Sequence, residues 1–189
     1  MLLLGHEGQL GRRVMELALE HGYELNLIAS ASAAGVSRGG RVNVVEGEYT
    51  MLGDLLEAMV RCDCVLSVLE PNAVGWGEDA ARRQMEILLS CRAAMDICSV
   101  SRIVFIDVVA DPAASSSNAQ GIAVAPAASP LEQEFAASSQ EWTCVQLHRY
   151  PREPLSTESC AAISRLLVDC MNDIRYYWKS VVCDCSAAV

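Results

Sequence analysis

Lysine is almost absent from this chain: Lys179 is the only one among 189 residues. Basic residues number 14 in total against 24 acidic ones, which gives a formal net charge of −10 at pH 7. Proteins that bind duplex nucleic acid neutralise its phosphates with Lys and Arg, and polybasic segments bind anionic membrane surfaces in the same way. The acidic balance therefore argues against direct binding to duplex nucleic acid and against a polybasic membrane patch.

Long apolar segments are also missing near the start of the chain. The longest early run is Met1–Leu4, which is too short for a signal peptide or a membrane span. The nine cysteines are an odd number, and most of them sit inside apolar runs, where Cys behaves as a small hydrophobic residue. We therefore expect reduced thiols in an intracellular protein, cytoplasmic by default, with a mitochondrion or another organelle left open.

The composition and the order of sequence patterns predict the fold class. Apolar residues form 52% of the chain and charged residues 20%, which is typical of a globular protein. Short β-rich runs alternate with segments of helical period, and this predicts an α/β fold with a mostly parallel, doubly wound, Rossmann-like sheet. Strands are predicted at 1–4, 24–29, 42–46, 64–69, 103–109 and 143–148, and helices at 9–21, 51–61, 78–94, 131–138 and 157–179. We place a single domain in residues 1–179, including a long Ala/Ser/Pro-rich loop at 111–130, and a C-terminal tail in residues 180–189.

The strongest functional signal is the motif GHEGQLG, in which Gly5, Gly8 and Gly11 follow the first predicted strand and open the first predicted helix. In this context the glycines allow a tight turn, a close approach of the backbone to a pyrophosphate, and close packing of the helix on the strand. The backbone N–H groups at the start of the helix, here those of Gln9 and Leu10, attract a negatively charged group. The motif therefore predicts a dinucleotide site.

The end of the second predicted strand indicates which dinucleotide is favoured. An NAD-binding protein of this type has an acidic residue about 20 residues after the glycine loop, which binds the ribose 2′-hydroxyl. This chain has Ala29-Ser30-Ala31-Ser32 there, followed by Arg38 and Arg41. Because hydroxyls and arginines accommodate a 2′-phosphate, the predicted cofactor is NADP, with Ser30 and Arg38 as candidate contacts.

Together with later segments, these features resemble the atypical short-chain dehydrogenases, in particular NmrA-like proteins and the small flavin reductase/biliverdin-IXβ reductase type. GHEGQLG is similar to the family's glycine loop, VVEGEY to the end of its third strand, CDCVLSVL to its fourth strand and SRIVFIDVVA to its fifth. The resemblance covers most of the chain, and it implies a Rossmann-like sheet that holds NADP and transfers a hydride to a flavin or similar planar acceptor. It places Glu48 beside the adenine, Leu69 and Glu70 at the end of the fourth strand, and Asp107 at the end of the fifth.

The chain departs from the family at several of these positions. His6 and Glu7 replace small residues of the glycine loop, Glu70 replaces a glycine or small residue, and Asp107 replaces a Thr or Ser. Three acidic residues thus surround the expected cofactor. This pattern predicts a degenerate NAD(P)-binding protein, a pseudoenzyme that serves as a structural or regulatory subunit and has weak or lost dinucleotide binding, or no cofactor at all.

The proton-relay pair of the wider superfamily, Tyr-x-x-x-Lys, is excluded by counting. The residue four positions before Lys179 is Arg175, and the chain has no other lysine. We therefore assign no catalytic residue. The alternative function is an NADPH-dependent reductase of the flavin-reductase type, which would act on a planar small-molecule acceptor by another mechanism.

Glu7 is the acid that the loop motif places nearest the pyrophosphate. Its carboxylate would satisfy the positive end of the helix dipole from within the chain and would repel a dinucleotide. Two alternatives leave the loop competent to bind: the Glu7 side chain turns to solvent, or it pairs with Arg12.

A protein partner or a homo-oligomer is expected from the last predicted helix. Its apolar stripe continues into Tyr176, Tyr177 and Trp178 after the expected contact with the sheet is complete. Aromatic residues are enriched at protein–protein interfaces, so this end of the helix suits a partner surface.

Three other patterns would indicate other chemistry. Residues 35–39 match G-x-S-x-G, but a nucleophile elbow needs a strand before the serine and a helix after it, and here a strand follows. The pairs Cys62/Cys64 and Cys183/Cys185 have one intervening residue, whereas structural zinc pairs normally have two to four. The P-loop motif G-x-x-x-x-G-K-[ST] does not occur. We therefore predict neither a hydrolase nor a P-loop nucleotidase, and no metal site.

Overall fold

One sheet of seven parallel strands organises the molecule in the computed structural model, which describes residues 1–30, 40–70, 79–109, 128–148 and 155–185. The strand order is β3-β2-β1-β4-β5-β6-β7, and every neighbouring pair is parallel. The strands are β1 (Leu2–Leu4), β2 (Leu25–Ala29), β3 (Val42–Glu46), β4 (Cys64–Ser67), β5 (Arg102–Val109), β6 (Glu141–His148) and β7 (Lys179–Asp184). The predicted Rossmann-like α/β fold is confirmed.

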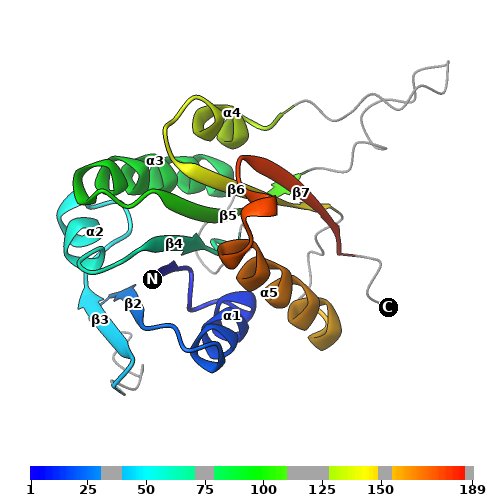
Figure 1. The fold of residues 1–189 in the computed structure, drawn as a ribbon, viewed down its shortest axis with the longest axis horizontal. Helices are drawn as coiled ribbons and strands as arrows, with labels where there is room; N and C mark the ends of the chain where they lie inside the picture. The colour runs from blue at the N-terminus through cyan, green and yellow to red at the C-terminus, as the bar shows by residue number, and fades with distance from the viewer. Residues whose placement is uncertain (31–39, 71–78, 110–127, 149–154, 186–189) are drawn as a thin grey trace, which may run out of the picture.

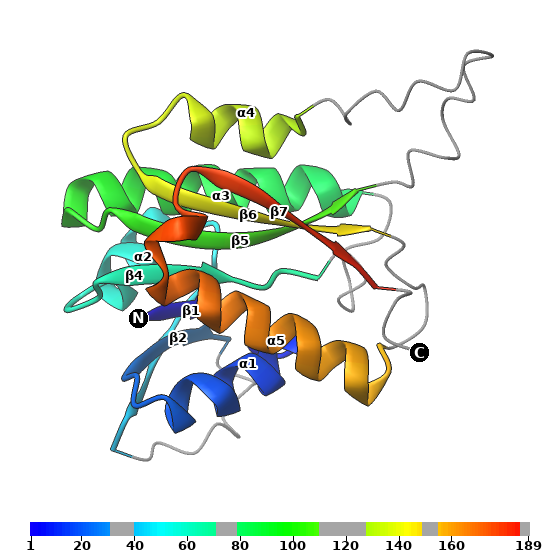
Figure 2. The same cartoon turned by 45° about the vertical axis from the view of Figure 1, so that its right-hand side comes forward.

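Helices cover both faces of this sheet (Figures 1 and 2). On one face lie α1 (Gln9–Glu20) and α5 (Thr157–Asn172), and on the other lie α2 (Leu52–Ala58), α3 (Ala80–Cys98) and α4 (Pro130–Ala136). Parallel strands need such crossover helices, and the central strands are buried on both sides as a result. No helix among the described residues is long and apolar enough to cross a membrane.

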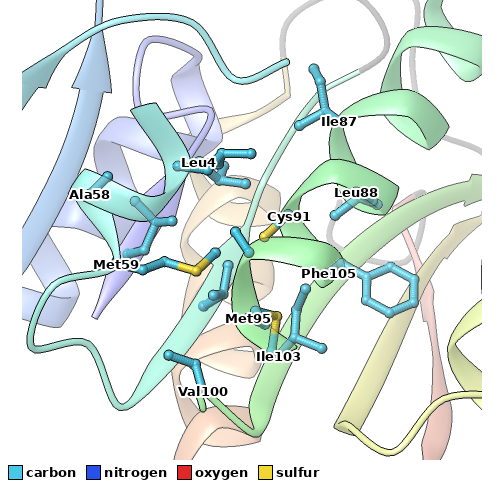
Figure 3. Close-up of a cluster of buried hydrophobic side chains, with 14 of the residues drawn as sticks. Leu4, Ala58, Met59, Ile87, Leu88, Cys91, Met95, Val100, Ile103 and Phe105 are labelled. Atoms are coloured by element: carbon cyan, nitrogen blue, oxygen red, sulfur yellow. The ribbon is translucent and has the colours of Figure 1, made fainter. Parts of the chain in front are cut away.

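The alternation of side chains along each strand supplies two separate cores. In β1, Leu2 and Leu4 point into the core under α2 and α3, whereas Leu3 points into the core under α1 and α5. Figure 3 shows the first core, where Leu4 and Met59 meet side chains of α3 and β5. All of these side chains are almost completely buried, so burial of apolar surface holds both layers of helices on the sheet.

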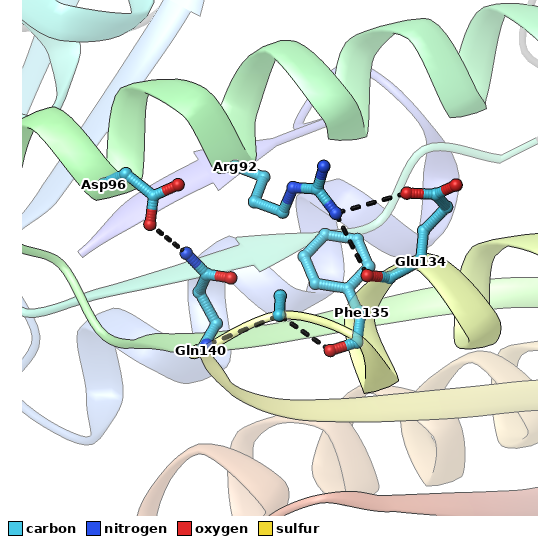
Figure 4. Close-up of polar contacts among 6 residues, drawn as sticks. Arg92, Asp96, Glu134, Phe135 and Gln140 are labelled. Atoms are coloured by element: carbon cyan, nitrogen blue, oxygen red, sulfur yellow. Dashed lines mark hydrogen bonds and ion pairs between the residues drawn. The ribbon is translucent and has the colours of Figure 1, made fainter.

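Polar contacts join α4 and the segment after it to the outer side of α3 (Figure 4). The Arg92 guanidinium donates to the carbonyl oxygen of Glu134 at 3.0 Å, and the Gln140 amide donates to the Asp96 carboxylate at 2.5 Å. Beneath them, the rings of Phe105 and Phe135 lie 4.7 Å apart. The short helix α4 is therefore fixed by both packing and hydrogen bonds.

The last helix is shorter than predicted. It ends at Asn172 instead of residue 179, because Asp173 has an extended backbone and its carboxylate accepts the N–H of Arg175 at 2.9 Å. This contact starts a 3-10 turn, η4 (Ile174–Tyr176). A side chain that caps a new turn competes with continuation of the α-helix, and here the cap determines the end of the helix.

The predicted C-terminal tail contributes a strand to the sheet. Trp178 has a left-handed backbone with φ 53°, and its N–H donates to the Trp142 carbonyl oxygen at 2.7 Å. The chain then continues as β7, which pairs with β6 over six residues. The prediction of a tail at 180–189 is therefore wrong for residues 180–184, and the stripe assigned to one helix is divided between a helix, a turn and a strand.

Several predicted features lie outside the described residues. They are Arg38, the G-x-S-x-G segment at 35–39, and residues 111–127 of the Ala/Ser/Pro-rich loop.

Candidate functional site

The site is positioned by the reversal of strand order at the centre of the sheet. β1 is followed by α1 on one face, while its neighbour β4 leads to α3 on the other face. In open parallel sheets, ligands bind in the crevice at the carboxyl ends of the strands at this switch point. The loop after β1 and the residues after β4 meet here.

The loop after β1 contains glycines where no other residue fits. Gly5 has φ +84°, and a Cβ atom on it would lie 2.6 Å from the Val68 carbonyl oxygen. A Cβ atom on Gly11 would lie 1.9 Å from the Gly5 carbonyl oxygen. The first glycine makes the turn against β4, and the last lets α1 pack against the loop, which are the roles predicted from the motif.

The start of α1 is occupied by a carboxylate of the chain itself. The Leu10 N–H donates to Oε1 of Glu70 at 3.0 Å. The same oxygen would lie 2.2 Å from a Cβ atom on Gly8. The Glu70 carboxylate therefore lies against the loop at Gly8, the middle glycine of the motif. Gly8 is the N-cap of α1 and supplies no side chain of its own. Glu70 therefore provides the negative group that a helix N-terminus favours.

Glu7 points elsewhere. The Tyr49 hydroxyl donates to the Glu7 carboxylate, 2.8 Å from the nearer oxygen, and it accepts the Gly5 N–H at 3.4 Å. The Glu7 side chain is half-exposed. Burial, and next the negative charge of Glu7, raise the pKa of the Tyr49 phenol, which stays protonated as the donor. The carboxylate at the helix N-terminus is thus that of Glu70 and not, as expected from the sequence, that of Glu7.

His6 is buried behind this loop. It is 3% exposed, and among the described residues its Nε2 atom has no hydrogen-bond partner. Burial lowers the pKa of His6, and the nearby Glu7 carboxylate only partly opposes this effect. The ring is therefore neutral at pH 7 and does not offset the negative charge of Glu7 or Glu70.

A cavity of about 370 Å³ opens at the carboxyl ends of β2 and β3, where α3 also begins. Three predicted site residues, Glu7, Ser30 and Glu48, line it. The Glu48 N–H donates to the Asp54 carboxylate at 2.8 Å, which fixes the turn after β3. The cavity is lined by Glu7, Ile28, Ser30, Gly47, Glu48, Tyr49, Thr50, Arg83, Glu86 and Ile87. Tyr49, Arg83 and Glu86 are not among the predicted site residues, because only the fold brings α3 and the turn after β3 together.

Leu69 and Asp107 lie away from that cavity. The Leu69 side chain is 2% exposed and packs in the core under α2 and α3, so only its backbone lies beside Gly5. Asp107 lies at the end of β5 in register with Gln146 of β6. Burial raises the pKa of Asp107, and its Oδ2 atom has no hydrogen-bond partner among the described residues. The structure brings Gly5, Glu7, Gly8, Gln9, Leu10, Gly11 and Glu70 together, with Ser30 and Glu48 at the adjoining cavity and Asp107 apart.

All nine cysteines lie within the described residues, and all are free thiols. Most of them are buried, and burial raises the pKa of a thiol. For Cys64 burial raises the pKa to about 11. Within the described part of the chain, no three His, Cys, Asp or Glu side chains are grouped closely enough to hold a metal ion.

A model of the NAD(P)H-binding family matches residues 5–165. The chain belongs to this family. This match confirms the NAD(P)-binding type of domain that the predicted resemblance implies, and solved structures of a nucleoside-diphosphate-sugar epimerase, a putative epimerase and an oxidoreductase share its fold. The chain matches no protein of curated function.

Solved structures share the whole fold at low sequence identity. A Rossmann-fold NAD(P)-binding protein from Shigella flexneri is 19% identical with a TM-score of 0.64, and the match covers 96% of this chain and 90% of that one. A short-chain dehydrogenase/reductase from Veillonella parvula in complex with NADP is 13% identical with a TM-score of 0.67, and the match covers 96% of this chain and 92% of that one. An enzyme from Bordetella bronchiseptica in complex with NAD⁺ is 14% identical with a TM-score of 0.69, and the match covers 96% of this chain and 74% of that one. At these identities the likeness shows the fold alone.

The residues of this chain fit a dinucleotide only in part. The glycine loop has the turn and the close approach that a pyrophosphate needs. However, the Leu10 N–H is bonded to Glu70, and a carboxylate stands at the start of α1 where a phosphate would bind. In this conformation the start of α1 does not accommodate the pyrophosphate of a dinucleotide.

Proposed function

We propose that this protein is a non-catalytic member of the NAD(P)H-binding family whose dinucleotide site is closed by Glu70, and that it acts as a structural or regulatory subunit. The observation that carries the proposal is the hydrogen bond from the Leu10 N–H to Glu70 Oε1 at 3.0 Å. A ligand phosphate would need that N–H group and the helix N-terminus for itself.

Electrostatic repulsion supports the proposal. At an effective dielectric constant near 20, two like unit charges about 4 Å apart repel by about 4 kcal/mol. A dinucleotide would have to displace Glu70 from α1 and then bind near the displaced carboxylate. Since each 1.4 kcal/mol or so is tenfold in affinity, even a fraction of this repulsion weakens binding by orders of magnitude.

The test is a titration of NADPH and NADH followed by nucleotide fluorescence and thermal shift. For the unmodified protein we expect weak or no binding. Glu70→Ala removes both the charge and the bulk, so it should tighten NADPH binding by about a hundredfold or more. Glu70→Gln removes the charge but keeps an oxygen that can still accept from Leu10, so it should give a smaller gain. Any dinucleotide that binds is expected to be NADPH in preference to NADH, since β2 ends at Ala29 and is followed by Ser30, with no acid at this position.

The matched control is Glu20→Gln, which makes the same change of charge at the exposed far end of α1. A submicromolar dissociation constant for NADPH in the unmodified protein would contradict the proposal. So would a Glu70→Ala variant that binds no better than the control.

The second candidate is an NADPH-dependent reductase of the flavin-reductase type. The retained geometry of the glycine loop at Gly5 and Gly11 favours it. Steady NADPH oxidation by the unmodified protein with a free flavin as acceptor would select this candidate. The absence of a Tyr-x-x-x-Lys pair means that a proton donor other than that pair would then be needed.

A further inference from the structure

The end of α5 borders a hollow on the side of the molecule where the strands begin, away from the glycine loop. This hollow has a volume of about 510 Å³ and is lined by Asp169, Asn172, Asp173, Ile174, Arg175 and Tyr176. It forms because the helix stops at Asn172 and the chain turns through η4 before it enters β7. Figure 2 shows this turn in orange-red at the left, where β5 and β6 begin. The hollow is therefore separate from the dinucleotide site, which lies at the carboxyl ends of the strands.

An apolar side chain is presented to solvent at this hollow. Ile174 is 73% exposed, the largest exposed fraction among the large apolar residues that the structure describes. Tyr176, two residues later in the same turn, is partly buried and packs against the core under α1 and α5. An apolar side chain from another molecule would therefore meet both residues here, and its burial would remove Ile174 from water.

The hollow also lacks a cation that the end of α5 favours. The C-terminus of a helix has a partial negative charge, which Lys or Arg in the last turn stabilises. The last turn of α5 contains no basic residue and carries Asp169, whose carboxylate has no ion pair among the described residues. Arg165, one turn earlier, is exposed and is not paired with it.

Arg175 does not supply this cation. Its Nε and Nη2 atoms both donate to Oδ2 of Asp173, at 2.7 Å and 2.5 Å. Two carboxylates and one guanidinium give the lining a formal charge of −1. Because Arg175 balances Asp173, the negative charge that is left belongs to Asp169, and the helix terminus adds to it.

We infer that this hollow docks a basic segment of another protein, in which an aliphatic or aromatic side chain is flanked by Lys or Arg. The apolar side chain would cover Ile174, and a flanking cation would lie against Asp169 and the carbonyl end of α5. A second copy of this chain does not fit, because a two-fold interface would set the hollow against itself and bring like charges together. The inference goes beyond the proposed function, since it does not depend on the state of the glycine loop.

The experiment titrates the full chain with a fluorescein-labelled peptide that has one Trp between two pairs of Arg, in about 0.15 M salt. Fluorescence anisotropy should show saturable binding, and amide NMR signals of residues 169–176 should shift. The same peptide with Glu in place of Arg should not bind. Ile174→Ser and Asp169→Asn should each weaken binding by about tenfold. The matched controls, Ile97→Ser at the end of α3 and Glu57→Gln in α2, lie on the other face of the sheet and should leave it unchanged.

Arg175→Gln should have the opposite effect. It removes the cation that balances Asp173, so the basic peptide should bind about threefold more tightly or better. The backbone N–H of residue 175 still donates to Asp173, which preserves the turn. Arg12→Gln, an exposed change of the same charge at the start of α1, should have little effect.

Three results would overturn the inference. The first is that the folded protein shows no saturable binding of the basic peptide, or shifts signals only outside residues 169–176. The second is that Asp169→Asn and Glu57→Gln weaken binding equally, which would mean a non-specific attraction to an acidic protein. The third is that Ile174→Ser binds as well as Ile97→Ser. NADPH binding is measured in a separate titration, so a failure of the proposed function is recognised independently.

Discussion

The Tyr49 hydroxyl is the point at which three residues of the glycine loop meet the turn after β3. It donates to Glu7, accepts from the Gly5 N–H, and lies 3.5 Å from Nδ1 of His6. The Tyr49 proton is held on the phenol because burial and Glu7 raise its pKa. Burial lowers the pKa of His6, so in mild acid the ring stays neutral in the folded state while it takes up a proton in the unfolded state.

His6 should make the protein less stable in mild acid. Its pKa is lowered in the folded state by burial, whereas an unfolded histidine takes up a proton near pH 6.5. The unfolded state thus binds the proton first as the pH falls, and the free energy of unfolding decreases below about pH 6.5. From pH 7.5 to 5.5 we expect a loss of about 1 kcal/mol, or a Tm lower by about 2–4 °C, and the loss should vanish in His6→Asn.

The control for this measurement is His21→Gln, at the exposed end of α1. Asp107 titrates with the opposite sign, because its pKa is raised by burial and acid favours its folded form. Comparing variants at each pH removes that contribution. An unchanged pH dependence in His6→Asn would show that the buried ring does not cause the effect.

The role of Glu70 illustrates which part of the site could be predicted from the sequence. The glycine spacing predicts the turn and the helix start, because both depend on neighbouring residues. Glu70 was expected near the cofactor, but its bond to Leu10 was not, since the two residues are sixty positions apart and meet only because β4 pairs with β1. Glu7 was therefore predicted at the helix N-terminus, because the contact between Glu70 and Leu10 depends on the three-dimensional fold.

At the scale of elements, Arg102 joins three segments at the amino ends of the strands. Its buried guanidinium donates to the Glu141 carbonyl oxygen at 2.6 Å, the Thr143 hydroxyl at 2.7 Å and the Cys170 carbonyl oxygen at the end of α5. It also lies 4.1 Å from the centre of the Tyr177 ring, just before β7. Carbonyl dipoles and an aromatic face therefore stabilise this charge.

Arg102→Lys should destabilise the protein by about 2–4 kcal/mol, because an ammonium cannot reach these acceptors in the same planar arrangement. Urea unfolding measures the loss, and hydrogen exchange should show that β7 loses protection first. Arg165→Lys, on the exposed side of α5, is the control and should be nearly neutral. Equal stability of the two variants would mean that Arg102 does not hold this junction together.

The C-terminal segment was wrongly predicted as a helix to residue 179 and a tail, and one cause is again a contact between residues that are distant in the sequence. The apolar stripe from 157 onward fits a helix, and the pattern contains no glycine or proline to end it. The helix ends because the Asp173 side chain caps a new turn and because β7 pairs with β6. The pairing of the two strands is a contact between distant residues. Helical period predicts α5 well, whereas an edge strand of six residues has too little pattern of its own to be found.

At the scale of the whole molecule, β7 forms one edge of the sheet and bears exposed apolar residues. Val182 is 59% exposed, and Trp178, just before the strand, is 56% exposed. Exposed edge strands with apolar side chains pair readily with other chains. We expect sedimentation equilibrium to show a dimer or a larger assembly, and Val182→Lys to raise its dissociation constant by about tenfold or more.

Ile97→Lys is the matched control, because Ile97 is similarly exposed at the end of α3. It should leave the assembly unchanged. A protein that sediments as a monomer at high concentration, with or without these changes, would contradict the prediction.

The strand order also affects how the chain folds while it is being synthesised. β4 pairs with β1, and from there each new strand pairs with the one made just before it, through β5 and β6 to β7. The sheet can therefore grow in one direction as residues leave the ribosome. β7 follows β6 in the chain, so a nascent chain of which only residues up to 148 have emerged holds the largely buried strand β6 with its outer edge unpaired. During that interval β6 is the segment most open to aggregation or to a chaperone, and completion of the last six-residue strand ends the exposure.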